Sequence, residues 1–230
     1  MLQLTGIKLF WYYLNSIRIT FLCVLFQVCL LITSNAQIPD FSHWTKEGQY
    51  DQLKIYTKDS TGSLKKFGAE FIVNSDVKAV LSLLRNVNNY NEWIEGIHEC
   101  RLVERMSDLS YSYHFFINKK ILFGLYTIKK DGFVNSVVTT RSNIMMIASN
   151  IDRSAPIESE YDRIDHYQVK WYVIPITKNR VKIMYEGVVD VQINFAYSLI
   201  KPTIIDNLKG SFSNMEAILK NSQKLSVNSH

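Results

Sequence analysis

Cysteine is scarce in this chain of 230 residues, and its three copies are unevenly placed. Cys23 and Cys29 lie in an N-terminal apolar run, so Cys100 is the one cysteine of the remaining sequence. A single thiol cannot form an internal disulfide, which excludes a small scaffold held together by disulfides. We interpret Cys100 as a buried structural thiol. His98 would share its face on a strand, but this spacing is only a weak indication of a nucleophile.

The chain also lacks the short motifs that carry much of enzyme chemistry. No H-E-x-x-H, Cys-x-x-Cys, phosphate-cradling or G-x-S-x-G pattern occurs, and the five histidines are too dispersed for a recognised metal site. We therefore expect neither a metal nor a cofactor. An Asn-x-Ser/Thr acceptor is missing as well, which fits a bacterial exported protein slightly better than a eukaryotic one.

The N-terminus has the pattern of a secretory signal peptide. Lys8 and Arg18 precede the apolar run Ile19 to Ile32, and the small residues Ser34-Asn35-Ala36 follow it. We predict cleavage after Ala36 and export to the periplasm or the cell exterior. An uncleaved membrane anchor is the alternative, because Phe10 to Leu14 lengthens the apolar stretch.

Charge and length limit the partners and the number of domains. Without residues 1–36 the net charge falls from +5 to +3, with 24 basic and 21 acidic residues in the remaining 194. The basic pairs are spread along the chain, so we expect no nucleic-acid partner, although transient contact with a membrane surface is an option. We divide the sequence into a signal peptide (1–36), an N-terminal segment (37–49), one folded domain (50–222) and a flexible tail (223–230), and we expect a monomer.

Strand and helix patterns are grouped rather than alternating. A helix is predicted from the N-cap Ser75 to Val87, and one further turn at Tyr90 to Trp93. Asn118-Lys119 and Asp131-Gly132 are read as turns between strands. Apolar runs predict the strands Leu53–Tyr56, Leu64–Val73, Cys100–Met106, Ser110–Ile117, Ile121–Lys130 and Val134–Ile147. This grouping indicates the α+β class.

Two further strands carry a clear alternation. In Tyr167 to Pro175 and in Val181 to Val191 the odd positions are apolar and the even positions are largely polar. An antiparallel register that keeps the apolar faces together sets Trp171 opposite Tyr185 and Val173 opposite Ile183. The same register sets Lys170 opposite Glu186 and His166 opposite Asp190, which we interpret as solvated cross-strand pairs.

After Phe195 the apolar residues recur every three or four positions, which predicts an amphipathic helix ending near Leu219. Pro202 fits its first turn. Gly210 marks either a close packing contact or a soft point of this helix. A plain core helix and a mobile lid fit the pattern equally well.

In this order of elements the chain resembles the START-like helix-grip superfamily of lipid-transfer domains and their bacterial relatives. The likeness rests on the helix ending in Tyr90-Asn91-Glu92-Trp93, on the strand pair Val169–Pro175 and Val181–Gly187, and on the final helix from Ile200. It extends from about Tyr50 to Lys220. The resemblance implies a curved antiparallel sheet around a long C-terminal helix, with a tunnel for one hydrophobic molecule and a gate made by the helix and nearby loops.

The sequence departs from this family at one point. START domains usually carry a proline-containing stretch that ends in an Arg-Asp pair, and the corresponding region Lys119 to Tyr126 has neither. No buried Arg or Asp is therefore carried over from the family. Arg141 is a candidate polar anchor within the cavity, with an outward, solvated arginine as the alternative. Arg163 near Asp165 is a similar candidate, interpreted as a surface pair.

Two functions follow from these expectations. The first is a carrier of a lipid or other hydrophobic molecule, without catalysis. The second is a cyclase-like or hydrolase-like enzyme with Tyr113, His114, Tyr126 or Tyr185 as acid or base. The full set of expected ligand contacts is Trp93, Tyr126, Arg141, Trp171, Val173, Ile183, Tyr185, Ile205, Leu208, Phe212 and Met215.

Overall fold

The computed structural model describes residues 38–59, 64–121, 124–156, 160–190 and 197–227. The expected signal peptide and its cleavage site lie outside these residues and stay predictions. No helix within the described ranges is both long enough and apolar enough to cross a bilayer.

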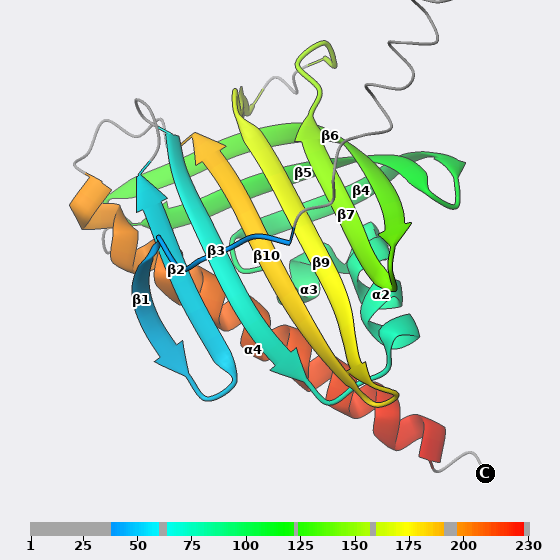
Figure 1. Ribbon diagram of the computed structural model, residues 1–230. Coiled ribbons are helices and arrows are strands. Elements are labelled where there is room, and N and C mark those ends of the chain that lie inside the picture. Colours follow the sequence, from blue (N-terminus) through cyan, green and yellow to red (C-terminus); the bar gives the residue numbers. More distant parts are fainter. Residues whose placement is uncertain (1–37, 60–63, 122–123, 157–159, 191–196, 228–230) are drawn as a thin grey trace, which may run out of the picture. The chain divides into compact units, whose positions relative to one another are not determined.

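Within the described residues, ten strands form one sheet, and three α-helices and a short 3-10 helix accompany it (Figure 1). The strands are β1 (Thr45–Tyr50), β2 (Leu53–Asp59), β3 (Leu64–Val73), β4 (Ile97–Ser107), β5 (Ser110–Ile121), β6 (Tyr126–Arg141), β7 (Ile144–Ile151), β8 (Asp162–Arg163), β9 (Tyr167–Thr177) and β10 (Arg180–Asp190). The helices are α2 (Val77–Arg85), η1 (Val87–Asn89), α3 (Tyr90–Trp93) and α4 (Tyr197–Val227).

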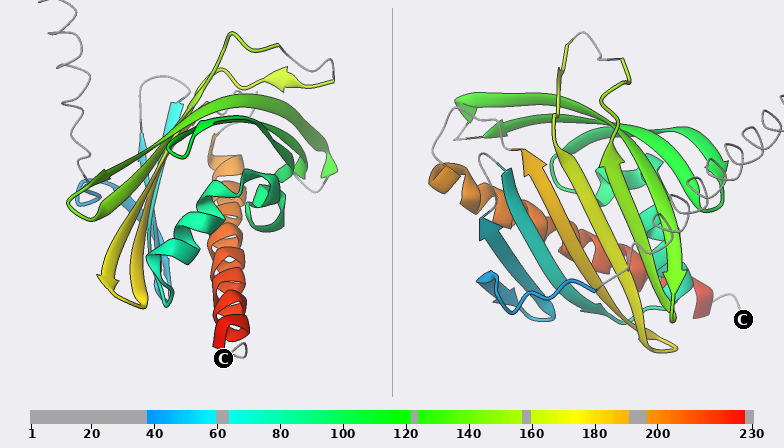
Figure 2. Two further views of the ribbon diagram at one scale, coloured as in Figure 1. Left: turned by 90° about the vertical axis from the view of Figure 1, so that its right-hand side faces the viewer. Right: turned by 45° about the horizontal axis from the view of Figure 1, so that its top comes forward.

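The sheet curves around α4, so the expected α+β helix-grip architecture is confirmed (Figure 2). The strand order is β1-β2-β3-β10-β9-β7-β6-β5-β4, with antiparallel neighbours throughout, and short β8 pairs parallel with β6. Pairing of β3 with β10 joins the first strands to the last one. This pairing makes one continuous inner face, against which α4 packs.

The register predicted for the last strand pair is confirmed. Trp171 lies opposite Tyr185, Val173 opposite Ile183, and Lys170 opposite Glu186. His166 lies one position before β9 begins, so the expected pair of His166 with Asp190 is not among the strand pairs, which end with Tyr167 opposite Val189. The His166 ring instead contacts the Arg153 guanidinium, with Nδ1 and Nη2 2.8 Å apart.

Two predicted turns are wrong, because the strands run through them. β6 passes through Asp131-Gly132 and ends at Arg141, where Ser142 and Asn143 with φ of 48° and 68° make the turn to β7. β5 likewise passes through Asn118-Lys119. Asp131 tolerates a central strand because its buried carboxylate is paired with arginine.

The ends of several elements also differ from expectation. β1 begins within the segment assigned to residues 37–49 and ends at Tyr50, and it extends the sheet beyond β2. Asp76, not Ser75, caps α2 by accepting a 2.8 Å hydrogen bond from the Ala79 amide. Pro202 lies inside α4 rather than in its first turn, and α4 continues to Val227, past the expected end near Leu219.

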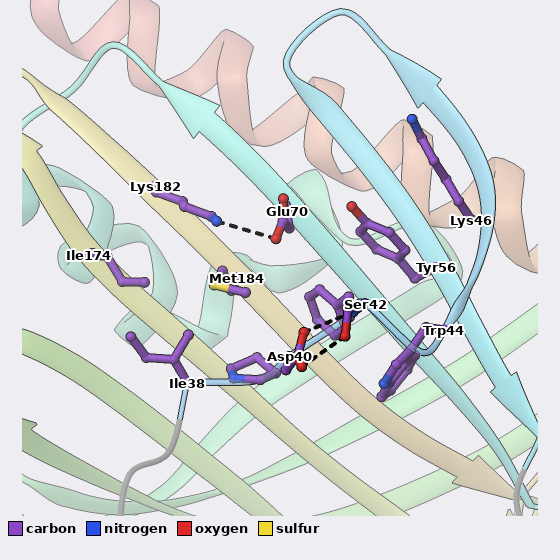
Figure 3. Close-up of a pocket in the computed structure, with 12 residues that line it drawn as sticks. Ile38, Asp40, Ser42, Trp44, Lys46, Tyr56, Glu70, Ile174, Lys182 and Met184 are labelled. Carbon is purple, nitrogen blue, oxygen red and sulfur yellow. Dashed lines mark hydrogen bonds and ion pairs between the residues drawn. The ribbon is translucent and has the colours of Figure 1, made fainter.

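The outer face of the sheet is covered in part by the segment Ile38 to Trp44, which crosses it (Figure 3). The Phe41 ring stacks on Tyr56 at 4.9 Å and meets Trp44 edge-on at 5.0 Å. An open groove of about 620 Å³ lies beside this segment, where Glu70 pairs with Lys182. The main core lies on the opposite face, between the sheet and the helices.

A candidate ligand-binding cavity

A cavity of about 290 Å³ lies between the inner face of the sheet, α3 and α4. Tyr167, Trp171 and Tyr185 point to this interior and yet remain partly accessible, because the cavity leaves them unpacked on one side. Leu208 and Phe212 of α4 contribute the opposite wall. A partly open space of this kind, lined mainly by apolar side chains with polar groups beside them, is typical of a small-molecule site.

One end of the cavity, here called the ring end, is lined by aromatic side chains in contact with one another. Trp171 is central, with ring centroids 4.8 Å from Tyr185, 5.8 Å from Phe212 and 5.9 Å from Trp93. Four more aromatic residues continue the wall, namely Tyr90, Tyr113, Phe115 and Tyr167. These contacts are tilted or edge-on, the arrangements that aromatic pairs prefer.

The position of the Tyr185 ring depends on a glycine two residues along β10. A Cβ on Gly187 would come within 2.3 Å of the Tyr185 hydroxyl oxygen. The ring therefore lies along the strand over Gly187 instead of projecting across the cavity. The absence of a Cβ at Gly187 makes room for the ring in this position.

The other end of the cavity, here called the hairpin end, lies at the β5–β6 hairpin and the first turns of α4. Its lining is aliphatic, from Ile117, Ile121, Ile128, Ile200 and Ile204. Polar groups join this lining, since Lys119 donates a hydrogen bond to the Asn207 side chain and Lys130 forms a 3.8 Å ion pair with Asp162. The cavity is thus aromatic at one end, and aliphatic with a basic margin at the other.

A polar contact ties the middle of α4 to the loop after α3. The Ser211 hydroxyl accepts a 2.9 Å hydrogen bond from the Glu95 amide and donates one of 2.7 Å to the Asn207 carbonyl. A Cβ on Gly210 would come within 2.8 Å of the Glu95 side chain. Of the two interpretations of Gly210, the close packing contact is the one seen.

The tyrosines of the cavity are neutral at physiological pH. Burial raises the pKa of Tyr113, Tyr167 and Tyr185 well above the ordinary value. Burial also raises the pKa of Cys100 to about 12, so its thiol stays protonated. Cys100 is buried and His98 is exposed, an arrangement of a structural thiol rather than an activated one.

Sequence reasoning missed a buried ionic cluster made by Arg163, Asp131 and His114. Arg163 binds Asp131 through two hydrogen bonds of 2.8 and 3.0 Å, and the His114 Nε2 atom lies 2.8 Å from the same carboxylate. Burial acts to raise the Asp131 pKa, but hydrogen bonds from Arg163 and then His114 hold that pKa below its usual value. Arg163 had been paired with Asp165, which is closer in sequence.

Arg163 has no N–H left for a ligand. Its other three donors bind the carbonyl oxygens of Asp152, Ala155 and Pro156, which completes the five that a guanidinium offers. The cluster therefore fastens the loop between β7 and β8 to the sheet. Its role in the structure is that of a clasp, although Arg163 borders the cavity.

The structure places five of the expected ligand contacts on the cavity wall: Trp93, Trp171, Tyr185, Leu208 and Phe212. Four others, Val173, Ile183, Ile205 and Met215, are buried in the core beside it. Val173 and Ile183 have the correct parity, but they lie nearer the β9–β10 turn, where the core leaves no space. Parity alone could not separate these two regions.

Tyr126 and Arg141 do not line the cavity, contrary to the prediction that they contact the ligand. They lie at the two ends of β6, and both are exposed. Arg141 was predicted in mid-strand because the turn at Ser142-Asn143 was not expected. Tyr126 was predicted in mid-strand because the preceding turn was placed at Asn118-Lys119, inside β5. Missed wall residues include Phe115 and Ile117, which the alternation along β5 could have revealed, whereas Tyr113, named as a possible acid or base, does line the cavity.

Comparisons with known proteins bear on the fold. No protein-family model matches the sequence, and no curated protein matches it. The solved STAR-related lipid transfer protein from Xanthomonas axonopodis aligns with a TM-score of 0.68 at 16% identity, covering 77% of this chain and 98% of that one. Human StAR-related lipid transfer protein 5 aligns with a TM-score of 0.69 at 10% identity, covering 91% and 99%.

An enzyme has the same architecture. The Zhui aromatase/cyclase from Streptomyces aligns with a TM-score of 0.51 at 9% identity, covering 68% of this chain and 94% of that one. Sequence identities this low are evidence for a shared fold and not for a shared function. The chain has the START-like helix-grip fold, a fold found in both lipid-transfer proteins and cyclases.

Proposed function

We propose that this protein binds and carries a hydrophobic small molecule in the cavity under α4. The observation that carries the proposal is the enclosed apolar space itself, which keeps the large side chains Tyr167, Trp171 and Tyr185 partly unpacked. Burial of a ligand there would remove apolar surface from water, at roughly 25 cal/mol per Å². The lipid-transfer proteins of the same fold support this proposal.

We favour a carrier over an enzyme because of the state of the candidate acid and base groups. The cavity tyrosines Tyr113 and Tyr185 are held protonated by burial, which suits hydrogen bonding more than proton abstraction. His114 points to the outer face, where it binds Asp131, and Tyr126 is at the exposed hairpin. The fold shared with a cyclase keeps an enzyme as the second candidate.

We further propose that the ligand enters at the hairpin end from a membrane surface. Leu125 at the β5–β6 hairpin is 87% exposed, and Tyr126 beside it is 40% exposed. Lysines at 119, 120, 129 and 130 flank these two side chains. An exposed apolar tip between cations fits transient binding to anionic lipid, at about 1 kcal/mol per lysine near the surface. The proposal includes export with removal of residues 1–36.

The carrier proposal is tested by ligand recovery. Protein expressed from the full chain would be stripped of lipid, incubated with a total lipid extract, re-isolated and extracted for mass spectrometry. A stoichiometric compound recovered unchanged supports a carrier. A chemically altered compound supports the enzyme, and no bound compound overturns both. The intact mass of the recovered protein tests cleavage after Ala36.

Membrane contact is tested with vesicles of phosphatidylserine and phosphatidylcholine. Leu125→Asp should weaken co-sedimentation with these vesicles several-fold. Leu109→Asp is the matched control, because Leu109 is 56% exposed at the β4–β5 hairpin, at the opposite end of β5. Equal loss in both variants would contradict docking through the β5–β6 hairpin.

A further inference from the structure

The ring end limits the kind of molecule that can occupy the cavity. At the packing density of protein interiors, about 0.74, a volume near 290 Å³ holds roughly a dozen non-hydrogen atoms. A phospholipid with two acyl chains is several times larger. The volume therefore suits a compact ligand.

The wall of the ring end favours a ligand that itself contains rings. Trp171 contacts Trp93, Tyr185 and Phe212, and Phe115 contacts Tyr167 at 5.1 Å, so the inner surface is largely aromatic. Aromatic pairs contribute about 0.5–1.5 kcal/mol beyond the burial of area alone, as judged by double-mutant cycles. A planar ring system can use several of these faces and edges at once, whereas an acyl chain cannot.

Two polar groups of ring-end residues lack a hydrogen-bond partner among the described residues, the buried Trp93 indole Nε1 and the Tyr185 hydroxyl. The Tyr185 hydroxyl makes no hydrogen bond to another described residue, and burial is the sole cause of the rise in its pKa. Tyr113 and Tyr167, by contrast, interact with each other through their hydroxyls. The Tyr185 ring lies along β10 over Gly187, where the absence of a Cβ leaves room for it, and this places its hydroxyl at the cavity wall. A ligand that displaces water from this part of the wall would leave the hydroxyl unsatisfied unless a ligand oxygen accepts its hydrogen bond.

We infer that the ligand is a compact compound with one or two fused rings and a single oxygen that hydrogen-bonds to Tyr185. This inference rests on the proposed carrier function and narrows its ligand class. The isoleucines of the hairpin end accommodate a short aliphatic substituent on the ring. A two-chain lipid is the alternative that this inference rejects.

The test compares two ligands that differ in one oxygen. Binding of 2-acetylnaphthalene and 2-ethylnaphthalene to the delipidated protein would be measured by isothermal titration calorimetry, with palmitate and phosphatidylcholine as rivals. We expect the ketone to bind about fivefold more tightly than the hydrocarbon, the value of one net hydrogen bond. Both should bind more tightly than palmitate, and phosphatidylcholine should not bind.

A hydroxyl deletion assigns the effect to its residue. Tyr185→Phe should abolish the preference for the ketone, because the carbonyl oxygen then has no hydroxyl donor, and should leave binding of the hydrocarbon nearly unchanged. Tyr56→Phe, on the outer face, is the matched control and should preserve the fivefold preference.

Three outcomes would overturn the inference. A preference that survives in Tyr185→Phe contradicts the role of this hydroxyl. Binding of palmitate or phosphatidylcholine with no binding of either naphthalene contradicts the ring class but leaves the carrier proposal intact. No binding of any of the four compounds contradicts both proposals.

Discussion

The two faces of the sheet are closed in different ways. On the outer face, the chain covers the strands with its own segments, which are held by the Phe41 stack and by the clasp of Arg163 on Asp131. On the inner face, α4 lies across the strands but leaves a cavity beneath Leu208 and Phe212. This contrast indicates that the outer face of the sheet has a structural role and the inner face a ligand-binding role. The outer polar cluster has its hydrogen bonds satisfied within the protein, whereas the inner face retains accessible side chains and the Tyr185 hydroxyl, which makes no hydrogen bond to another described residue.

The largest expected effect on stability comes from a substitution on the outer face of the sheet. Asp131→Ala leaves the Arg163 guanidinium buried without its counter-charge, and should lower the free energy of unfolding by about 3–5 kcal/mol in urea titrations. The control Asp162→Ala removes a carboxylate from the exposed end of a 3.8 Å pair and should change it by less than about 1 kcal/mol. A similarly small loss in both variants would show that the clasp does not contribute to the free energy of unfolding.

The same carboxylate gives a pH dependence with a defined sign. The native pKa of Asp131 is below its unfolded value near 3.8, so folding favours the ionised form. Its stabilising contribution is complete above about pH 5 and is lost as the pH falls through the native pKa. Urea titrations of Asp131→Asn between pH 6 and pH 3 should show a shallower acid loss than the wild type. An unchanged slope would contradict this assignment.

A smaller effect on stability, but a large one on binding, is expected on the inner face. Leu208→Trp places a large ring in the cavity and should weaken binding of 2-acetylnaphthalene at least about tenfold. The free energy of unfolding should change by less than about 1.5 kcal/mol. Ala217→Trp, on the exposed side of α4, is the control and should leave affinity unchanged. Retained affinity in Leu208→Trp would mean that the ligand binds elsewhere.

The smallest expected effect concerns how α4 is held over the cavity. Ser211→Ala removes the acceptor of the Glu95 amide and should lower stability by about 1 kcal/mol. Hydrogen exchange of the Glu95 amide and ligand release should both become faster. The exposed Ser213→Ala is the control. Faster exchange without faster release would separate this contact from any gating of the cavity.

The parts of this fold that could be predicted from the sequence are those with a regular pattern of apolar residues. The register of β9 with β10 followed from strict parity, and the long helix followed from its three-and-four spacing. β6 was divided wrongly because Asp131 and Gly132 have the composition of a turn. Its true environment depends on Arg163, which lies 32 positions away in the chain. Pairing over such a distance leaves no local signal.

The candidate site shows the same limit. Parity correctly turned Trp171, Val173, Ile183 and Tyr185 inward, but it could not say where α4 packs tightly and where it leaves space. That difference depends on crossing geometry and on how side chains of several elements fill the interior. The clasp of Arg163 was missed for a related reason, because its partners come from three separate segments.

The most direct test of the central claim is native mass spectrometry of the protein as purified from expressing cells. The wild type should carry a bound hydrophobic compound at up to one molecule per chain, and Leu208→Trp should carry little or none, while Ala217→Trp matches the wild type. A wild-type protein that remains empty after incubation with lipid extract and with 2-acetylnaphthalene would contradict the account. Equal occupancy in Leu208→Trp would contradict the cavity as the binding site.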